Sequence, residues 1–192
     1  AEVSMEGLTI SGGSSSGINN NGTLSLTNST ISGNSATSGG GIDNSGTLSL
    51  TNSTISGNFA NGGSFAGNGG GIYNRGTLSQ TNSTISGNSA TSRGGGILNR
   101  GTLSQTNSTI SGNSATSGGG IDNRGTLSQT NSTISGNFAG SGGGILNSGT
   151  LSQTNSTISG NSAASRGGGI FNTETLSQTG STISGNSATD RG

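Results

Sequence analysis

A unit of about 24 residues recurs along the whole chain of 192 residues. One complete copy, GTLSLTNSTISGNSATSGGGIDNS, occupies residues 22–45. The eight units begin at residues 1, 22, 46, 76, 101, 125, 149 and 174; the first is divergent, and the last stops before its GGGI segment. One such unit is too short to bury an apolar face alone, whereas stacked copies bury one another. The sequence therefore predicts a single β-solenoid domain over residues 1–192.

Three segments of each unit, TLSLT, STISG and GGGIDN, carry the strand signal. Polarity that alternates with a period of two is typical of β-strands, and the chain has no helical period and no proline. We expect an all-β parallel β-helix of about eight coils with three strands per coil, roughly 38 Å long at ~4.8 Å per coil. The unit that begins at residue 46 carries an insertion at residues 61–68, which we expect to project as a loop.

Apolar and asparagine residues recur at fixed places in the unit, so that they would form columns along the stack. In the unit that begins at residue 101, Leu103, Ile110 and Ile121 represent three apolar columns. These columns predict a thin but continuous core. Two asparagine columns, which contain Asn107 and Asn113, are expected to point inward at corners and to bond along the stack.

Two further columns complete the predicted interior. One changes from Met5, Leu26 and Leu50 to glutamine from Gln80 onward, which predicts an internal or strand-end amide ladder in the later coils and a drier interior in the first three. The other is an alanine column, represented by Ala115, which we place at a turn with little room for a side chain.

The charge of the chain is low and balanced. The charges of six arginines balance those of six acidic residues, and the chain contains no lysine, histidine or cysteine. Binding to nucleic acid or to an anionic membrane surface needs clustered cations, so we expect neither partner. No apolar run approaches the ~18 residues of a membrane span. The first ten residues, AEVSMEGLTI, lack a secretory signal, so any export signal is expected to lie outside this chain.

The acidic residues do not form a catalytic pattern. Asp43 and Asp122 share a column but lie three coils apart, about 14 Å at the usual strand spacing. Glycoside chemistry needs two acids within about 5–10 Å, and the serines have no histidine or lysine to activate them. We interpret these acids as solvated surface groups and expect no enzyme activity, no catalytic residue, no cofactor and no metal site.

Two tetrapeptides carry a resemblance to a known family. GGGI at residues 39–42 and ISGN at residues 31–34, with their copies, resemble the GGA[ILV] and FxxN signatures of polymorphic outer-membrane-protein repeats. The whole unit resembles the right-handed parallel β-helix repeats of large bacterial surface and secreted proteins. The resemblance implies a right-handed coil, extracellular or cell-surface display and frequent adhesive roles.

Three outward rows are candidate functional surfaces. A flat array of hydroxyl groups resembles the ice-binding faces of β-solenoid antifreeze proteins; its central part is Thr77, Ser79, Thr81, Thr102, Ser104, Thr106, Thr126, Ser128 and Thr130. A variable row, which follows the buried isoleucine of the third strand and also contains Asp43 and Asp122, is a candidate partner surface with exposed apolar groups, namely Tyr73, Leu98, Leu146 and Phe171. A row of arginines is expected to splay into solvent or to contact an acidic glycan; it consists of Arg75, Arg100 and Arg124.

The first and last units place apolar residues where no further coil of this chain covers them. These candidates for end-to-end stacking are Val3, Met5, Ile10, Leu176 and Ile183. The partners that we expect are a second copy, neighbouring repeats of a longer chain, or a glycan or host cell surface. The predicted function is a non-catalytic extracellular element, such as a stalk, an adhesin segment or a filament subunit, and ice binding is the alternative.

Overall fold

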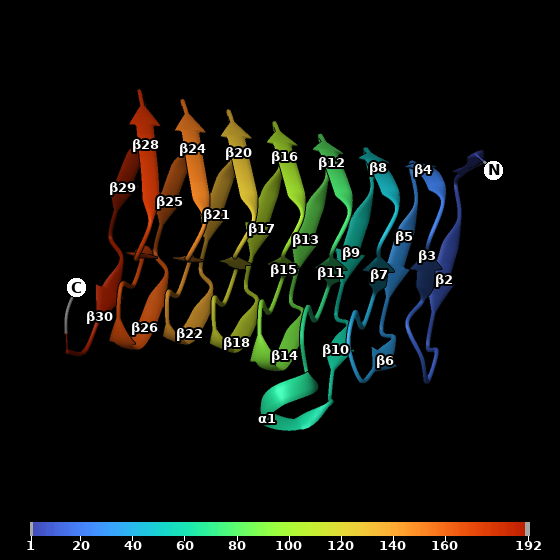
Figure 1. Ribbon diagram of the computed structural model, residues 1–192, viewed down its shortest axis with the longest axis horizontal. Helices are drawn as coiled ribbons and strands as arrows, with labels where there is room; N and C mark the ends of the chain where they lie inside the picture. The colour runs from blue at the N-terminus through green and yellow to red at the C-terminus, as the bar shows by residue number, and fades with distance from the viewer. Residues whose placement is uncertain (1, 191–192) are drawn as a thin grey trace.

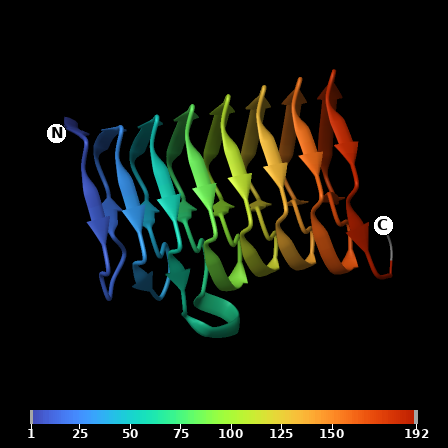
Figure 2. The ribbon, with the colours of Figure 1, turned by 180° about the vertical axis from the view of Figure 1, so that it is seen from behind.

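The computed structural model describes residues 2–190 and is a parallel β-solenoid with four sheets. In Figure 1 the chain ascends along the front of the stack, descends behind it and advances from N to C, which is a right-handed winding. Figure 2 shows the same regular stack from behind. Two sheets contain a strand from all eight coils and two contain a strand from seven, and every strand pairs with its counterpart in the neighbouring repeat.

The two longest sheets are formed by the first half of the repeat, and we name them by their sequences. The TLSxT sheet contains β1 (Glu2–Glu6), β4 (Thr23–Thr27), β8 (Thr47–Thr51), β12 (Thr77–Thr81), β16 (Thr102–Thr106), β20 (Thr126–Thr130), β24 (Thr150–Thr154) and β28 (Thr175–Thr179). The TIS sheet contains β2 (Thr9–Ser11), β5 (Thr30–Ser32), β9 (Thr54–Ser56), β13 (Thr84–Ser86), β17 (Thr109–Ser111), β21 (Thr133–Ser135), β25 (Thr157–Ser159) and β29 (Thr182–Ser184).

The second half of the repeat forms the other two sheets. The alanine sheet contains β6 (Ser35–Ala36), β10 (Phe59–Ala60), β14 (Ser89–Arg93), β18 (Ser114–Ser117), β22 (Phe138–Ser141), β26 (Ser162–Arg166) and β30 (Ser187–Ala188). The IxN sheet contains β3 (Ile18–Asn20), β7 (Ile42–Asn44), β11 (Ile72–Asn74), β15 (Ile97–Asn99), β19 (Ile121–Asn123), β23 (Ile145–Asn147) and β27 (Ile170–Asn172).

The alanine sheet corrects the expectation of three strands per coil. The alanine positions were expected to form a turn, yet Ala90 pairs with Ala115 and Ala115 with Ala139 in parallel ladders. A methyl side chain is small enough to point into this narrow corner while the backbone stays extended. The extra residues of the third coil leave the stack beside this sheet, where they include the short helix α1 (Gly63–Ala66).

The predicted core is confirmed. The side chains of Leu103, Ile110 and Ile121 are buried, and residues of the same three columns form one continuous cluster along the stack. Leu103 pairs with Leu127 and Ile110 with Ile134, so each column keeps its register from coil to coil. No helix within residues 2–190 is long and apolar enough to cross a membrane.

Amide ladders run through the interior beside the apolar columns. The Gln105 side chain donates to Gln80 at 2.7 Å, and Gln129 donates to Gln105 at 2.6 Å, which confirms the predicted glutamine ladder. The Asn113 side chain donates to Asn137 at 3.0 Å and to the backbone carbonyl of Ile85 at 3.1 Å, which confirms the inward asparagine column.

The other predicted asparagine column is not a ladder. Asn107 and its equivalents are exposed at the turn between the TLSxT and TIS sheets and have φ near 50°. Asparagine tolerates this left-handed conformation, and Gly180 occupies the same place in the last coil with φ of 59°. The next residue points inward instead: the Ser108 hydroxyl donates to the Thr106 carbonyl at 2.9 Å and accepts from the backbone N–H of Ser83 at 3.2 Å.

Candidate functional site

The outer side of the IxN sheet carries the variable row, and most of this row is covered. Tyr73, Leu98 and Asp122 are buried, whereas Leu146 and Phe171 are half-buried. The expectation of exposed apolar groups is therefore wrong for Tyr73 and Leu98. The GGG loop that leads into each strand folds back over the row. A Cβ placed on Gly94 would lie 2.4 Å from the backbone nitrogen of Leu98, so only glycine fits there.

Near the start of this row, the Arg75 side chain contacts two residues of the row, Asp43 and Tyr73. The Arg75 guanidinium donates to the Asp43 carboxylate at 2.7 Å and lies 4.9 Å from the centre of the Tyr73 ring. Arg100, one coil further on, lies 5.7 Å from the same ring. Arg75 thus folds along the row, and the interpretation of arginines splayed into solvent is wrong for it, whereas Arg100 lies near the same ring and remains exposed.

Asp122 is the most perturbed titratable group among residues 2–190. Its side chain is fully buried, which corrects the interpretation of a solvated surface acid. The Arg124 Nε donates to Asp122 Oδ1 at 3.0 Å, and Arg93 Nη1 lies 3.8 Å from Oδ2, an oxygen that accepts no hydrogen bond in the structure. Burial raises the pKa of Asp122 to about 7, although the charges of Arg93 and Arg100 act to lower it.

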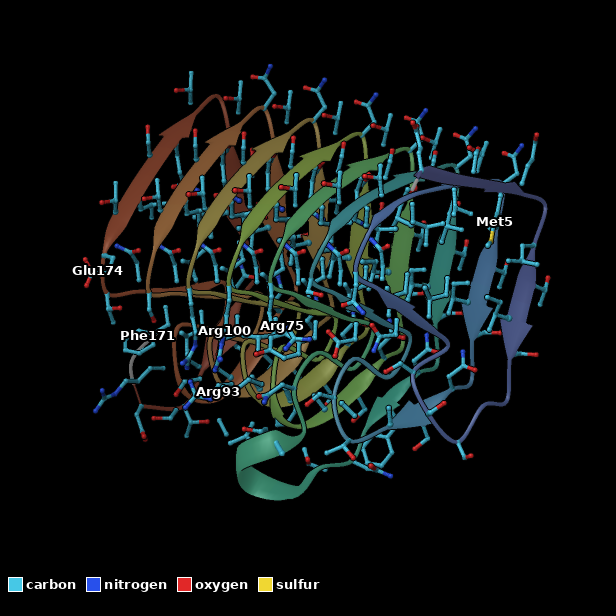
Figure 3. The ribbon with its side chains drawn as sticks, turned by 45° about the vertical axis from the view of Figure 1, so that its right-hand side comes forward. Met5, Arg75, Arg93, Arg100, Phe171 and Glu174 are labelled. Carbon is cyan, nitrogen blue, oxygen red and sulfur yellow. The ribbon has the colours of Figure 1, made fainter. Side chains whose placement is uncertain are left out.

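Every arginine within residues 2–190 lies along this outer side. Arg93 and Arg166 end strands of the alanine sheet, and Arg166 lies 5.9 Å from the ring of Phe171. Figure 3 shows Arg75, Arg93, Arg100 and Phe171 on one side of the stack. We call these residues the arginine stripe; they are Arg75, Arg93, Arg100, Arg124 and Arg166.

The sequence pointed to only part of this stripe. The row of Arg75, Arg100 and Arg124 recurs at one place in the repeat, but Arg93 and Arg166 stand before the GGG loop, in a different column. Two columns meet over the IxN sheet because the GGG loop turns the chain back across it. The available signal was the motif SRGGGI, which occurs in two units and places arginine directly before that loop.

The hydroxyl array lies on the outer side of the TLSxT sheet. Thr102 and Ser104 are exposed and Thr106 is half-buried, and the same pattern holds at Thr77, Ser79 and Thr81 and at Thr126, Ser128 and Thr130. Each residue pairs with its own counterpart in the next coil, without a shift of register along the sheet. The hydroxyl groups therefore form straight columns parallel to the solenoid axis.

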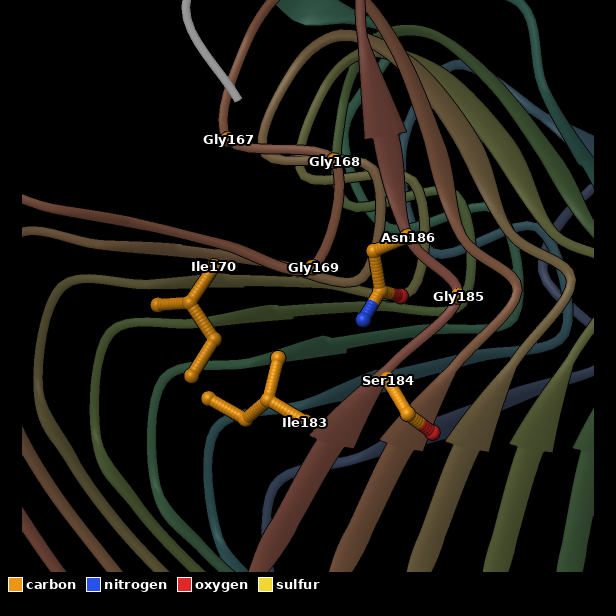
Figure 4. Close-up of a pocket in the computed structure, with 8 residues that line it drawn as sticks. All are labelled: Gly167, Gly168, Gly169, Ile170, Ile183, Ser184, Gly185 and Asn186. Carbon is orange, nitrogen blue, oxygen red and sulfur yellow. The ribbon is translucent and has the colours of Figure 1, made fainter.

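Both end coils of the described stack expose core positions. Val3 and Met5 are 42% and 39% exposed, and Ile10 is half-buried. At the other end Ile183 is 47% exposed and Leu176 is half-buried. Figure 4 shows Ile170 and Ile183 beside a hollow of about 280 Å³ at this end.

The described carboxylates do not gather into a metal site: within residues 2–190 no group of three or more His, Cys, Asp or Glu is placed to hold an ion. The acids away from the stripe lie on the end coils, with Glu2 and Glu6 in β1 and with Glu174 and Asp190 in the last coil. Within residues 2–190, the arginines thus lie on the coils between the two ends, and the end coils carry only acidic charges.

Residues 82–100 and 155–173 match the family model described as Chlamydia polymorphic membrane protein (Chlamydia_PMP) repeat. Each stretch begins at the exposed turn, passes through ISGN and GGGI, and includes a strand of the IxN sheet. The resemblance to polymorphic outer-membrane-protein repeats is thus confirmed for these two repeats. No curated protein and no solved structure matches the chain. The repeats and the fold fit the class of surface structural or adhesive β-solenoids.

Proposed function

We propose that this chain is a non-catalytic, extracellular structural segment that forms a rigid rod and carries adhesive faces at the cell surface. The observation that carries this proposal is the continuity of the stack. All four sheets run from coil to coil, and only the alanine sheet shows shifts of register. The matched surface-protein repeats support the proposed location.

The interior explains why such a rod would be stiff. Parallel strand ladders direct their backbone hydrogen bonds along the solenoid axis, and the asparagine, glutamine and serine ladders add side-chain bonds in the same direction. Bending the rod would lengthen many of these bonds at once. A repeat protein built in this way transmits order from each coil to its neighbours.

The proposal is tested by locating the protein and measuring its shape. Antibodies raised against the purified chain should label intact cells that produce it, and protease added to those cells should remove the label. Negative-stain images of a tandem fusion of two copies should show rods twice as long as those of one copy. Label found only after cell lysis, or globular particles that do not lengthen, would overturn the proposal.

We propose ice binding as a second function, because the hydroxyl columns of the TLSxT sheet keep an unbroken register over the seven strands from β4 to β28. Regular ranks of hydroxyl and methyl groups can hold an ordered layer of water. The first test is whether the purified chain shapes growing ice crystals and lowers the freezing point below the melting point. Ice growth identical to that in buffer alone would rule out this function.

A further inference from the structure

The arginine stripe places five of the six arginines of a neutral chain on one face. The stripe has five guanidinium groups, and the carboxylates that pair with them are Asp43 and Asp122. Arg100 and Arg166 are exposed and form no ion pair with any residue between 2 and 190. With both aspartates ionised, the five arginines and their two paired carboxylates still carry an excess of three positive charges, five minus two.

We propose that the arginine stripe binds an anionic polysaccharide, which lies along the solenoid axis and is held through its carboxylate or sulfate groups. This inference deepens the adhesive part of the proposed function by naming the class of partner. The guanidinium fork binds planar carboxylates and sulfate-like oxyanions with two parallel hydrogen bonds. Arg75, Arg100 and Arg124 stand in consecutive coils, about 4.8 Å apart, so a polymer with repeated charges can contact all three.

The paired arginines keep donors available to such a ligand. The side chains of Arg75, Arg93 and Arg124 are 45%, 40% and 31% exposed, although each contacts an aspartate. Asp43 and Asp122 thus hold these side chains along the row without covering them. A polymer would meet arginines that are already positioned, and ordering them on binding would cost little entropy.

The surroundings of the stripe favour a polysaccharide over other polyanions. Single-stranded nucleic acids need free aromatic faces on which bases stack, whereas the Tyr73 ring is buried and faces Arg75 and Arg100. A membrane surface needs apolar side chains that insert between lipids, whereas Leu98, in the middle of the row, is fully buried. A flexible chain of charged sugars requires neither feature.

Asp122 gives this binding a dependence on pH. The charged groups that face it are Arg93, Arg100 and Arg124, and burial raises its pKa to about 7. Protonation below that pH removes one negative charge from the stripe and frees Arg93 and Arg124 from their ion pairs. Binding of a ligand whose charge does not change should therefore strengthen several-fold between pH 8 and pH 6.

The experiment measures binding of the full 192-residue chain to heparin and to polygalacturonate, with neutral dextran and single-stranded DNA for comparison. Wild type should bind both acidic polysaccharides in a salt-dependent manner and should not bind dextran. Arg100→Gln together with Arg166→Gln should weaken binding at least tenfold, because these are the arginines without an acidic partner. Asp122→Asn should bind heparin equally at pH 8 and pH 6, at the level of wild type at pH 6.

A matched control distinguishes an effect of the charges in the stripe from an effect of the net charge of the chain. Glu2→Gln also changes the charge by one unit but lies in β1 of the first coil, away from the stripe, so it should leave binding unchanged; circular dichroism would check that each variant is folded. Equal strengthening by Glu2→Gln, binding to DNA as tight as to heparin, or no binding to either polysaccharide would overturn the inference. The surface-labelling and rod-length experiments are unaffected by these outcomes, so the proposed function is judged separately.

Discussion

Asp122 is the residue whose burial has the clearest consequence for stability. The pKa of its carboxyl group rises from 3.8 to about 7 in the folded chain. Between these values the folded protein holds a proton that the unfolded chain has released, so the free energy of unfolding falls as pH rises from about 4 to about 7. Asp122→Asn removes this effect. The variant should be more stable than wild type above pH 7, by up to about 4 kcal/mol at about 1.4 kcal/mol per pKa unit.

Thermal unfolding followed between pH 4 and pH 8 would test this prediction. The difference between Asp122→Asn and wild type should be largest at pH 8 and should vanish near pH 4. The control is Asp43→Asn, which removes a partly exposed carboxylate from the ion pair with Arg75. A stability difference that is constant across this range, or a variant less stable than wild type at pH 8, would contradict the buried and destabilised state of Asp122.

At the scale of single elements, the two asparagine columns offer a matched comparison. The Asn113 side chain donates to Asn137 and to Ile85, and its Oδ1 accepts from the backbone N–H and the side chain of Asn88 at 2.9 and 3.0 Å. Asn113→Ala would leave these buried groups without partners, so we expect a loss of about 2–4 kcal/mol. Asn107→Gly changes an exposed residue with φ near 50° and should be almost neutral.

Urea unfolding of both variants shows whether the hydrogen-bonded ladder of Asn113 stabilises the protein, or whether the asparagine is merely repeated without such an effect. Asn113 and Asn107 both recur along the sequence, so equal effects would show that the inward placement of Asn113 contributes nothing. Protection of backbone amides in the neighbouring coils should also fall in Asn113→Ala, because its partners lie in the coils that contain Asn88 and Asn137.

The hydroxyl array of the TLSxT sheet is tested by a change that leaves the interior alone. Thr102→Tyr with Thr106→Tyr places two rings on the outer side of β16, while Leu103 and Gln105 keep their inward positions. If wild type shapes ice crystals, this variant should lose that activity and keep the wild-type melting temperature. Retained activity would show that the flat array is not the ice-binding surface, and lost stability would show that these threonines do more than face solvent.

Periodicity predicted those elements whose side chains alternate strictly. Leu103 and Ile110 point inward because each lies one residue from an outward threonine, and Gln105 shares the parity of Leu103. Asn123 could have been found in the same way: it follows Ile121 by two residues, and its side chain donates to Asn147 at 2.7 Å in a ladder that the columns above did not include. Where a loop breaks the alternation, the position of a residue in the repeat no longer determines whether its side chain points inward. The predictions failed at these places.

The burial of Asp122 and the full arginine stripe could not be derived from columns alone. Both depend on how far the GGG loop turns back over the IxN sheet, which is a property of backbone angles and not of side-chain polarity. Gly118 has φ of 61°, and a Cβ on it would lie 2.7 Å from the Cα of Asp122. The contact between Arg93 and Asp122 joins neighbouring coils, so it exists only because these two units differ from the other copies.

For the whole molecule, the end coils define how the stack can be extended. Strand β1 and strand β28 each pair on one side only, and the core residues beside them are the exposed Val3, Met5 and Ile183. A parallel strand placed against either edge would continue the backbone ladders and bury these side chains, whether it came from a second copy or from further coils of the same chain. The contact would join unlike surfaces, a geometry that produces filaments when it does not close.

We therefore expect the purified 192-residue chain to associate end to end. Light scattering over a concentration series should show particles that grow with concentration, because apolar burial at the ends favours association at about 25 cal/mol per Å² of buried apolar surface. Val3→Lys with Ile183→Lys places a charge at each end and should restore a monomer without altering the middle coils. The control, Ser104→Lys, adds a charge to the exposed outer side of the TLSxT sheet and should leave association unchanged. A wild-type chain that stays monomeric at high concentration would contradict the prediction, as would association that Val3→Lys with Ile183→Lys does not reduce.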